Sequence, residues 1–184
     1  MRALAGLMVA LFLLSGCAGH VSLPSYGVVE PFDLTDSSGK PFDSRTLDGH
    51  VWIADFIFTN CAGPCPRMSS QMRLLQIRLD GDASAVKLVS FTVDPDRDTP
   101  EVLAEYSRRY HAESGRWYFL TGPKPRLHHI TREVFRLGDV TGTLEHSTRF
   151  ALVDKQGRIR GFYPSDDTAQ IQQLFRDAKV LLPG

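Results

Sequence analysis

The stretch VWIADFIFTNCAGPCPRM, residues 51–68, decides the fold of this chain. Residues 51–58 are nearly all apolar, which is typical of a strand covered on both faces. A helical pattern follows at once, since Met68, Met72, Leu75 and Leu79 are spaced at i, i+4, i+7 and i+11. The sequence therefore predicts a strand, a short turn and an amphipathic helix that begins at Cys65.

Cys61 and Cys65 lie in the turn between this strand and this helix. We expect both sulfurs at an exposed turn, with the helix N-terminus favouring thiolate over thiol. Two thiolates at this spacing can close a redox disulfide or hold a soft metal ion such as copper(I), and zinc could use the same donors. An inert structural bridge is the third interpretation, although so short a loop constrains the unfolded chain little.

The rest of the chain alternates between strand and helix patterns. Strands are predicted at 86–93, 117–120, 148–153 and 158–163, and helices after Thr99-Pro100, around 127–137 and from 168 to 182. In the second helix, Val102, Leu103, Tyr106 and Tyr110 are expected to face inward. Residues 32–35 and 40–42 flank a turn-rich segment and predict an N-terminal β-hairpin. The sequence thus predicts an α/β fold, thioredoxin-like, with a mixed sheet flanked by helices.

Composition favours one soluble globular domain. Of 184 residues, 42% are hydrophobic, which is enough for a real core. Lysine plus arginine number 21, and so do aspartate plus glutamate, so no basic surplus indicates a nucleic-acid partner.

The N-terminus has the pattern of a bacterial lipoprotein. Arg2 precedes an apolar run, residues 3–14, that is too short to span a bilayer and is typical of a signal peptide. The run ends in LSGC, residues 14–17, which resembles a lipobox; an ordinary signal peptide with an incidental cysteine is the alternative. We expect residues 1–16 to be removed and Cys17 to carry a lipid anchor. Residues 17–30 then form a flexible tether and 31–184 the folded domain, in the bacterial cell envelope outside the cytoplasm.

Four segments in order resemble the Sco/SenC family of copper proteins. These are the strand and cysteine turn at 55–66, VDP at 93–95, RDTP at 97–100 and Glu145-His146-Ser147. The resemblance implies a thioredoxin-like domain that binds a copper ion through Cys61, Cys65 and His146. It also implies copper delivery to, or thiol maintenance of, the dinuclear copper site in subunit II of cytochrome c oxidase. The family commonly has aspartate where this chain has Glu145.

Three acidic side chains are candidates to surround the metal site. Asp55 lies in the buried strand, where it could relay protons during disulfide exchange or be a hydrogen-bonded core residue. Asp94 and Asp98 follow the next core strand, at the same sheet edge, so they could tune the site; capping of the following helix is the plainer role of Asp98 or Thr99. Met68 and Met72 could donate thioethers, but their spacing is that of a core stripe.

Two other functions stay open. A thiol:disulfide oxidoreductase would use Cys61 to attack and Cys65 to resolve, and a partner thiol reductant is expected for either use of the pair. Thioredoxin-type oxidoreductases resemble one another in a cis-proline before a late core strand, yet no proline occurs between Pro125 and Pro164. His146 occupies that neighbourhood instead. A peroxidase-like redox sensor would need a peroxide pocket that the sequence does not indicate.

Overall fold

The computed structural model describes residues 23–79, 86–136 and 148–182. The elements along the chain are β1 (Asp33–Asp36), β2 (Pro41–Asp43), the 3-10 turn η1 (Ser44–Leu47), β3 (Val51–Ile57), α1 (Pro64–Arg78), β4 (Val86–Thr92), α2 (Pro100–Arg109), β5 (Trp117–Thr121), α3 (Lys124–His129), the π-helical turn η3 (Ile130–Val134), β6 (Arg149–Val153), β7 (Ile159–Pro164) and α4 (Thr168–Val180).

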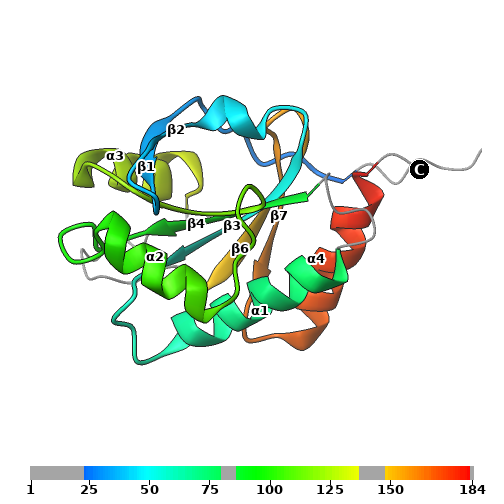
Figure 1. The fold of residues 1–184 in the computed structure, drawn as a ribbon. Coiled ribbons are helices and arrows are strands. Elements are labelled where there is room, and N and C mark those ends of the chain that lie inside the picture. Colours follow the sequence, from blue (N-terminus) through cyan, green and yellow to red (C-terminus); the bar gives the residue numbers. More distant parts are fainter. Residues whose placement is uncertain (1–22, 80–85, 137–147, 183–184) are drawn as a thin grey trace, which may run out of the picture.

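Within the described residues, seven strands form one mixed sheet in the order β2-β1-β5-β4-β3-β6-β7. The central strands β3, β4 and β5 are parallel, and the hairpins β1–β2 and β6–β7 add antiparallel edges on either side. Helices α1, α2 and α4 cover one face of this sheet and α3 covers the other (Figure 1). The predicted α/β class, mixed sheet and N-terminal β-hairpin are confirmed.

Strand β3 is the centre of the fold. All seven of its residues are buried, because β3 has a strand on each side and helices over both faces. Alternate side chains therefore enter two separate cores: Ile53 and Ile57 pack towards α1 and α4, and Ala54 and Phe56 pack towards α3. The carboxyl end of β3 leads directly into the cysteine turn.

The helices differ from the expected pattern in three details. Helix α1 begins at Pro64, one residue before Cys65, because proline is suited to the first helical position. Val102 is 38% exposed, so its predicted inward position in α2 was wrong; Leu103 and Tyr106 provide the buried contacts. The third helical pattern is divided between α3 and the π-helical turn η3.

The segment before β1 is folded onto the sheet edge over part of the predicted tether. The Tyr26 N–H donates to the Ile159 carbonyl at 2.9 Å, and the Val29 N–H donates to the Gly157 carbonyl at 2.8 Å. Leu23 packs against the core cluster that lies under α1, α2 and α4. Folded structure therefore starts earlier than residue 31, the predicted start of the domain, because the outer edge of β7 offers unpaired backbone groups to this segment.

Candidate metal centre

The two cysteines lie together between the end of β3 and the first turn of α1. Cys61 is 9% exposed and Cys65 is fully buried, in the same core cluster as Met68 and Met72. The expectation of two exposed sulfurs was therefore wrong for this state of the protein. The burial also agrees with a packing role for both methionines, since neither side chain is exposed.

Burial favours the thiol form of Cys65 over the thiolate. Burial raises the pKa of Cys65 far above its usual range, and a hydrogen bond with the Cys61 side chain adds to this effect. A backbone hydrogen bond from Phe58 works in the opposite direction. Loss of solvation thus outweighs the helix N-terminus, and the predicted preference of Cys65 for thiolate was wrong. The hydrogen bond nevertheless places the Cys61 and Cys65 side chains next to each other.

Asp98 holds the cysteine turn against the end of β4. Its carboxylate is 1% exposed and accepts hydrogen bonds from the Thr59 hydroxyl at 2.6 Å, the Thr59 N–H at 3.1 Å and the Thr92 hydroxyl at 2.5 Å. Thr59 is two residues before Cys61, so Asp98 fixes the backbone that presents the first sulfur. The cap of α2 is Thr99, whose hydroxyl accepts from the Val102 N–H.

Asp94 belongs to the same loop but contacts its own neighbours. Its N–H donates to the Thr92 hydroxyl at 3.0 Å, and its carboxylate forms an ion pair with Arg97 at 2.7 Å. The Asp94 carbonyl accepts the Asp98 N–H at 2.9 Å, which joins the two ends of this loop. Thr59 and Thr92 are the residues that the sequence interpretation missed. In the sequence, only their positions could have pointed to them: Thr59 is two residues before Cys61, and Thr92 is two residues before Asp94.

Asp55 is buried below the cysteines on β3. Its Oδ1 accepts a 2.5 Å hydrogen bond from the Ser90 hydroxyl, which in turn accepts from the Trp117 indole N–H at 3.0 Å. Its Oδ2 has no hydrogen-bond partner among the described residues. Burial raises the pKa of Asp55 to about 7, and a charge on Asp55 adds to the raised pKa of Cys65. The structure therefore places a titratable carboxyl close enough to Cys65 to influence its proton.

His146 and Cys17 lie outside the described residues, as does Glu145. In residues 23–79, 86–136 and 148–182, no three side chains of histidine, cysteine, aspartate or glutamate come together as a metal site. The same residues contain no cis peptide bond and no helix that is long and apolar enough to cross a membrane.

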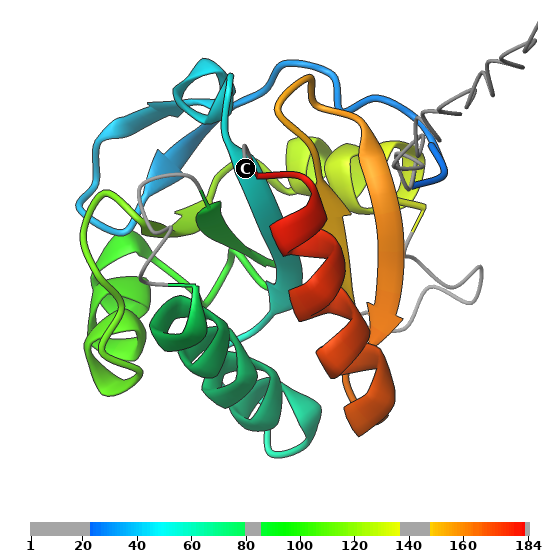
Figure 2. The same ribbon diagram turned by 90° about the vertical axis from the view of Figure 1, so that its right-hand side faces the viewer.

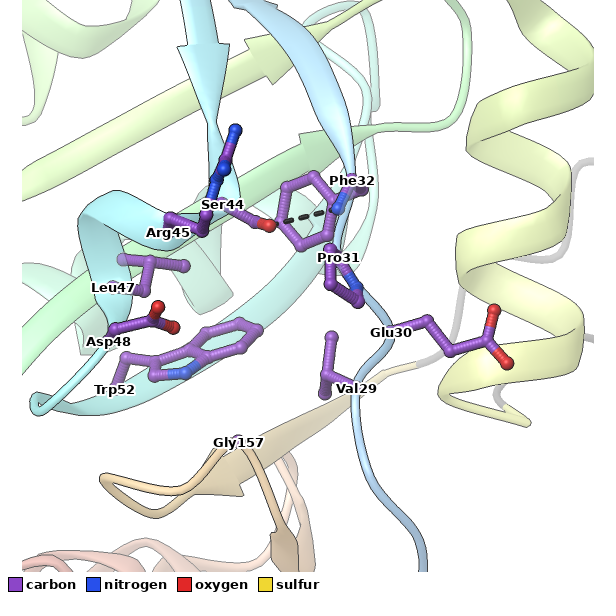
Figure 3. A pocket seen from close by; sticks show the side chains of 10 residues that line it. All are labelled: Val29, Glu30, Pro31, Phe32, Ser44, Arg45, Leu47, Asp48, Trp52 and Gly157. Carbon is purple, nitrogen blue, oxygen red and sulfur yellow. Dashed lines mark hydrogen bonds between the residues drawn. The ribbon is translucent and has the colours of Figure 1, made fainter.

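A separate pocket lies at the other end of β3. Figure 3 shows it between the N-terminal segment, η1 and Trp52, with the Phe32 N–H donating to the Ser44 hydroxyl at 2.9 Å. Trp52 is near the start of β3, whereas the cysteines follow its end. This pocket is therefore distinct from the cysteine site and contains neither sulfur.

The SCO1/SenC family model matches residues 22–181, which include the whole cysteine site and the sheet around it. The chain belongs to the SCO1/SenC family. A SCO1 protein homolog of Bacillus subtilis (strain 168) is 30% identical over 187 residues, covering 97% of each chain. A protein of Stutzerimonas stutzeri that is named as copper-binding is 33% identical over 152 residues, covering 78% of this chain and 72% of its own.

Solved SCO1/SenC structures share the fold. A family lipoprotein from Bacillus anthracis str. Ames superposes with a TM-score of 0.76 at 34% identity, covering 84% of this chain and 95% of its own. BsSco, described as a member of the Sco family of cytochrome c oxidase assembly proteins with a disulfide switch, has a TM-score of 0.73 at 31% identity, covering 84% and 93%. The family resemblance and the thioredoxin-like fold are confirmed.

Proposed function

We propose that this protein binds copper through Cys61, Cys65 and His146 and serves cytochrome c oxidase assembly. In this role it delivers copper to, or keeps reduced the thiols of, the dinuclear copper site in subunit II. The observation that carries the proposal is the contact between the two cysteine sulfurs at the end of β3. Two adjacent sulfur donors and one imidazole suit a soft, low-coordinate ion such as copper(I).

The buried site couples metal binding to proton release. Copper requires both sulfurs as thiolates, yet Cys65 is strongly biased towards the thiol. Two thiolates together neutralise the charge of copper(I) and leave one negative charge, so the ion replaces the protons as the partner of the sulfurs. Asp98 would keep Thr59 and the turn in place during this exchange, and Asp55 would lie beneath it as a nearby acid.

Oxidation of the same pair switches metal binding off. Closing the Cys61–Cys65 disulfide releases two electrons and two protons to an oxidant, and the bridged sulfurs no longer act as thiolate ligands. A thiol reductant protein would return both electrons and protons before copper loads. The disulfide switch of BsSco, a relative that is 31% identical to this chain, supports a redox role for the pair.

Membrane attachment is the other part of the proposal. A lipid on Cys17 would hold the domain at the outer side of the cytoplasmic membrane, within the bacterial cell envelope. The relative from Bacillus anthracis is a family lipoprotein. Mass spectrometry of the mature N-terminus tests this point, because an unmodified Cys17 would contradict the anchor.

Anaerobic copper(I) titration of the reduced protein tests the ligand set. We expect one copper per chain, with binding lost in Cys65→Ala and strongly weakened in His146→Ala. His129→Ala is the matched control, since His129 lies on the opposite face of the sheet in α3 and its side chain is 44% exposed. Equal affinity in the His146 and His129 variants would remove histidine from the site.

A thiol:disulfide oxidoreductase is the alternative function, and the buried Asp55 beneath Cys65 is the observation that favours it. Such an enzyme would attack a substrate disulfide through Cys61 and resolve the mixed disulfide through Cys65. Rapid catalytic reduction of a disulfide substrate, in a protein that fails to bind copper, would support this function over the copper chaperone.

A further inference from the structure

Helices α1 and α4 form a basic surface on one side of the molecule. Helix α1 carries Arg67, Arg73 and Arg78 and no acidic residue, and α4 carries Arg176 and Lys179. The one acid within either helix, Asp177, is 9% exposed and accepts hydrogen bonds from Tyr163 and Gln173, both at 2.7 Å. The nearest other acids in sequence are Asp80 and Asp82 after α1 and Asp166 and Asp167 before α4. The whole chain has no net charge, so the basic residues of these two helices concentrate positive charge on one side of the molecule.

The same surface is apolar between its charges. Leu74, Ile77 and Val180 are 54%, 53% and 51% exposed, and they are three of the six large apolar side chains that are exposed in the described part of the chain. A groove of about 230 Å³ separates the helices, with Leu74 on one side and Phe175 on the other. Figure 2 shows α1 and α4 side by side in front of the sheet. We call this basic and apolar surface of the two helices the α1–α4 face.

The N-terminal segment reaches the folded domain close to this face. Leu23 packs against the core cluster that α1, α2 and α4 share, and its carbonyl accepts a hydrogen bond from Arg160 of β7, the strand that α4 packs against. Leu23 follows Cys17 by only six positions, so even a fully extended chain spans no more than about 21 Å between them. A lipid on Cys17 would therefore keep the α4 end of this face within reach of the bilayer surface.

We propose that the α1–α4 face docks on the anionic surface of the membrane that holds the lipid anchor. The proposal rests on the lipid attachment at Cys17 proposed above. Arginine and lysine around exposed leucine, isoleucine and phenylalanine are the composition of surfaces that lie on anionic bilayers, where charge and apolar burial act together. The short tether selects a bilayer over an acidic protein partner, because the bilayer is already within reach of this face.

Docking in this way fixes the position of the cysteine site relative to the membrane. Helix α1 begins at the cysteine turn and lies in the docked face. The cysteine turn would therefore sit at the edge of the contact, next to any partner domain that is itself close to the bilayer surface. A membrane protein client could then reach Cys61 without the domain leaving the membrane.

Quenching by brominated lipids tests the docking in the full lipidated chain. We would reconstitute the Ile77→Trp variant in vesicles of phosphatidylcholine with about one third phosphatidylglycerol, with brominated acyl chains; the composition provides the anionic surface that the proposal requires. The native Trp52 and Trp117 are 3% and 4% exposed and contribute a constant background. The His128→Trp variant places the probe on an exposed position of α3, on the opposite face of the sheet. We expect quenching in the first variant and none above background in the second.

Charge removal distinguishes docking from mere proximity. In the Ile77→Trp background, we would combine Arg73→Gln, Arg78→Gln and Arg176→Gln. The ratio of docked to undocked protein should fall about a hundredfold, which corresponds to about 1 kcal/mol for each basic residue. The matched control changes three basic residues elsewhere, Arg109→Gln, Lys124→Gln and Arg132→Gln, and should retain the quenching.

Three outcomes would overturn the proposal. These are equal quenching of the probes on α1 and α3, no quenching on α1 with anionic vesicles, or quenching that survives loss of the three arginines. If the α1–α4 face binds an acidic protein instead, it would stay unbound in vesicles, and the probe on α1 would not be quenched. Copper titration of the same samples separates this proposal from the proposed function, because the arginine variants should bind copper normally. Failed copper binding with intact docking would contradict only the metal site.

Discussion

The Asp55→Asn substitution tests the buried carboxyl beneath the cysteines. Asn keeps the shape of the side chain and can still accept the hydrogen bond that Ser90 donates to Oδ1. It replaces the unpartnered Oδ2 with an amide group, whose burial adds a cost that does not depend on pH. What the substitution removes is the titration of Asp55 in the folded protein.

The sign and size of the effect follow from the pKa. The pKa of Asp55 rises from 3.8 to about 7 on folding, because burial disfavours the carboxylate. Between these values the folded state binds more protons than the unfolded state, so wild-type stability falls as pH rises through this range and levels off above about pH 7. The difference of about 3.2 pKa units corresponds to about 4 kcal/mol in total at 1.36 kcal/mol per unit. About 3 kcal/mol of this falls between pH 5 and pH 8.

Urea unfolding of the reduced proteins at several pH values measures this quantity. The free energy of unfolding of Asp55→Asn minus that of the wild type should increase by about 3 kcal/mol from pH 5 to pH 8. Asp96→Asn is the control, because it makes the same chemical change at a side chain that is 69% exposed. Parallel curves for Asp55→Asn and the wild type would refute a raised pKa for Asp55 and, with it, a proton-accepting role beside Cys65.

Two further predictions concern the packing around the site. Asp98→Ala should lower the free energy of unfolding by about 3 kcal/mol or more, because Thr59 and Thr92 lose their buried acceptor. A loss below about 1 kcal/mol, measured by urea unfolding, would contradict the anchoring role of Asp98. Met72→Ala should lower the free energy of unfolding by about 2–5 kcal/mol, because Met72 is fully buried. Val102→Ala is the control and should lower it clearly less, because Val102 is 38% exposed. Similar losses of stability for the two variants, measured by calorimetry, would contradict the assignment of Met72 to the core.

Local sequence patterns were sufficient for most of the framework. The continuous apolar run of β3 and the stripe from Met68 to Leu79 led to the correct strand and helix, since a buried strand and an amphipathic helix each impose their own spacing. The order of strands and helices then led to the α/β class. The apolar pattern in α2 wrongly predicted that Val102 is buried. Helical spacing identifies the apolar side of a helix but does not tell how much of that side the neighbouring strand covers.

Sequence reasoning named candidate residues for the site but missed the environment of the two cysteines. Cys61 and Cys65 were recognised from their spacing, but the thiolate preference inferred for Cys65 neglected its burial, which only the packing of α1 on the sheet reveals. Asp98 was recognised as a neighbour of the site, whereas its contact with Thr59 joins residues 39 positions apart. No local pattern predicts such a contact, because it depends on β3 and β4 lying side by side.

The sequence by itself determined which groups this protein brings to its chemistry: two cysteines at a strand-to-helix turn, in a chain whose motifs are those of the SCO1/SenC family. Tertiary structure decided the state of those groups. It buries Cys65 beside Cys61, places Asp55 beneath them and fixes their turn through Asp98. The physical reason is that spacing is a property of the local chain, whereas solvation and hydrogen bonding depend on every element packed around the site.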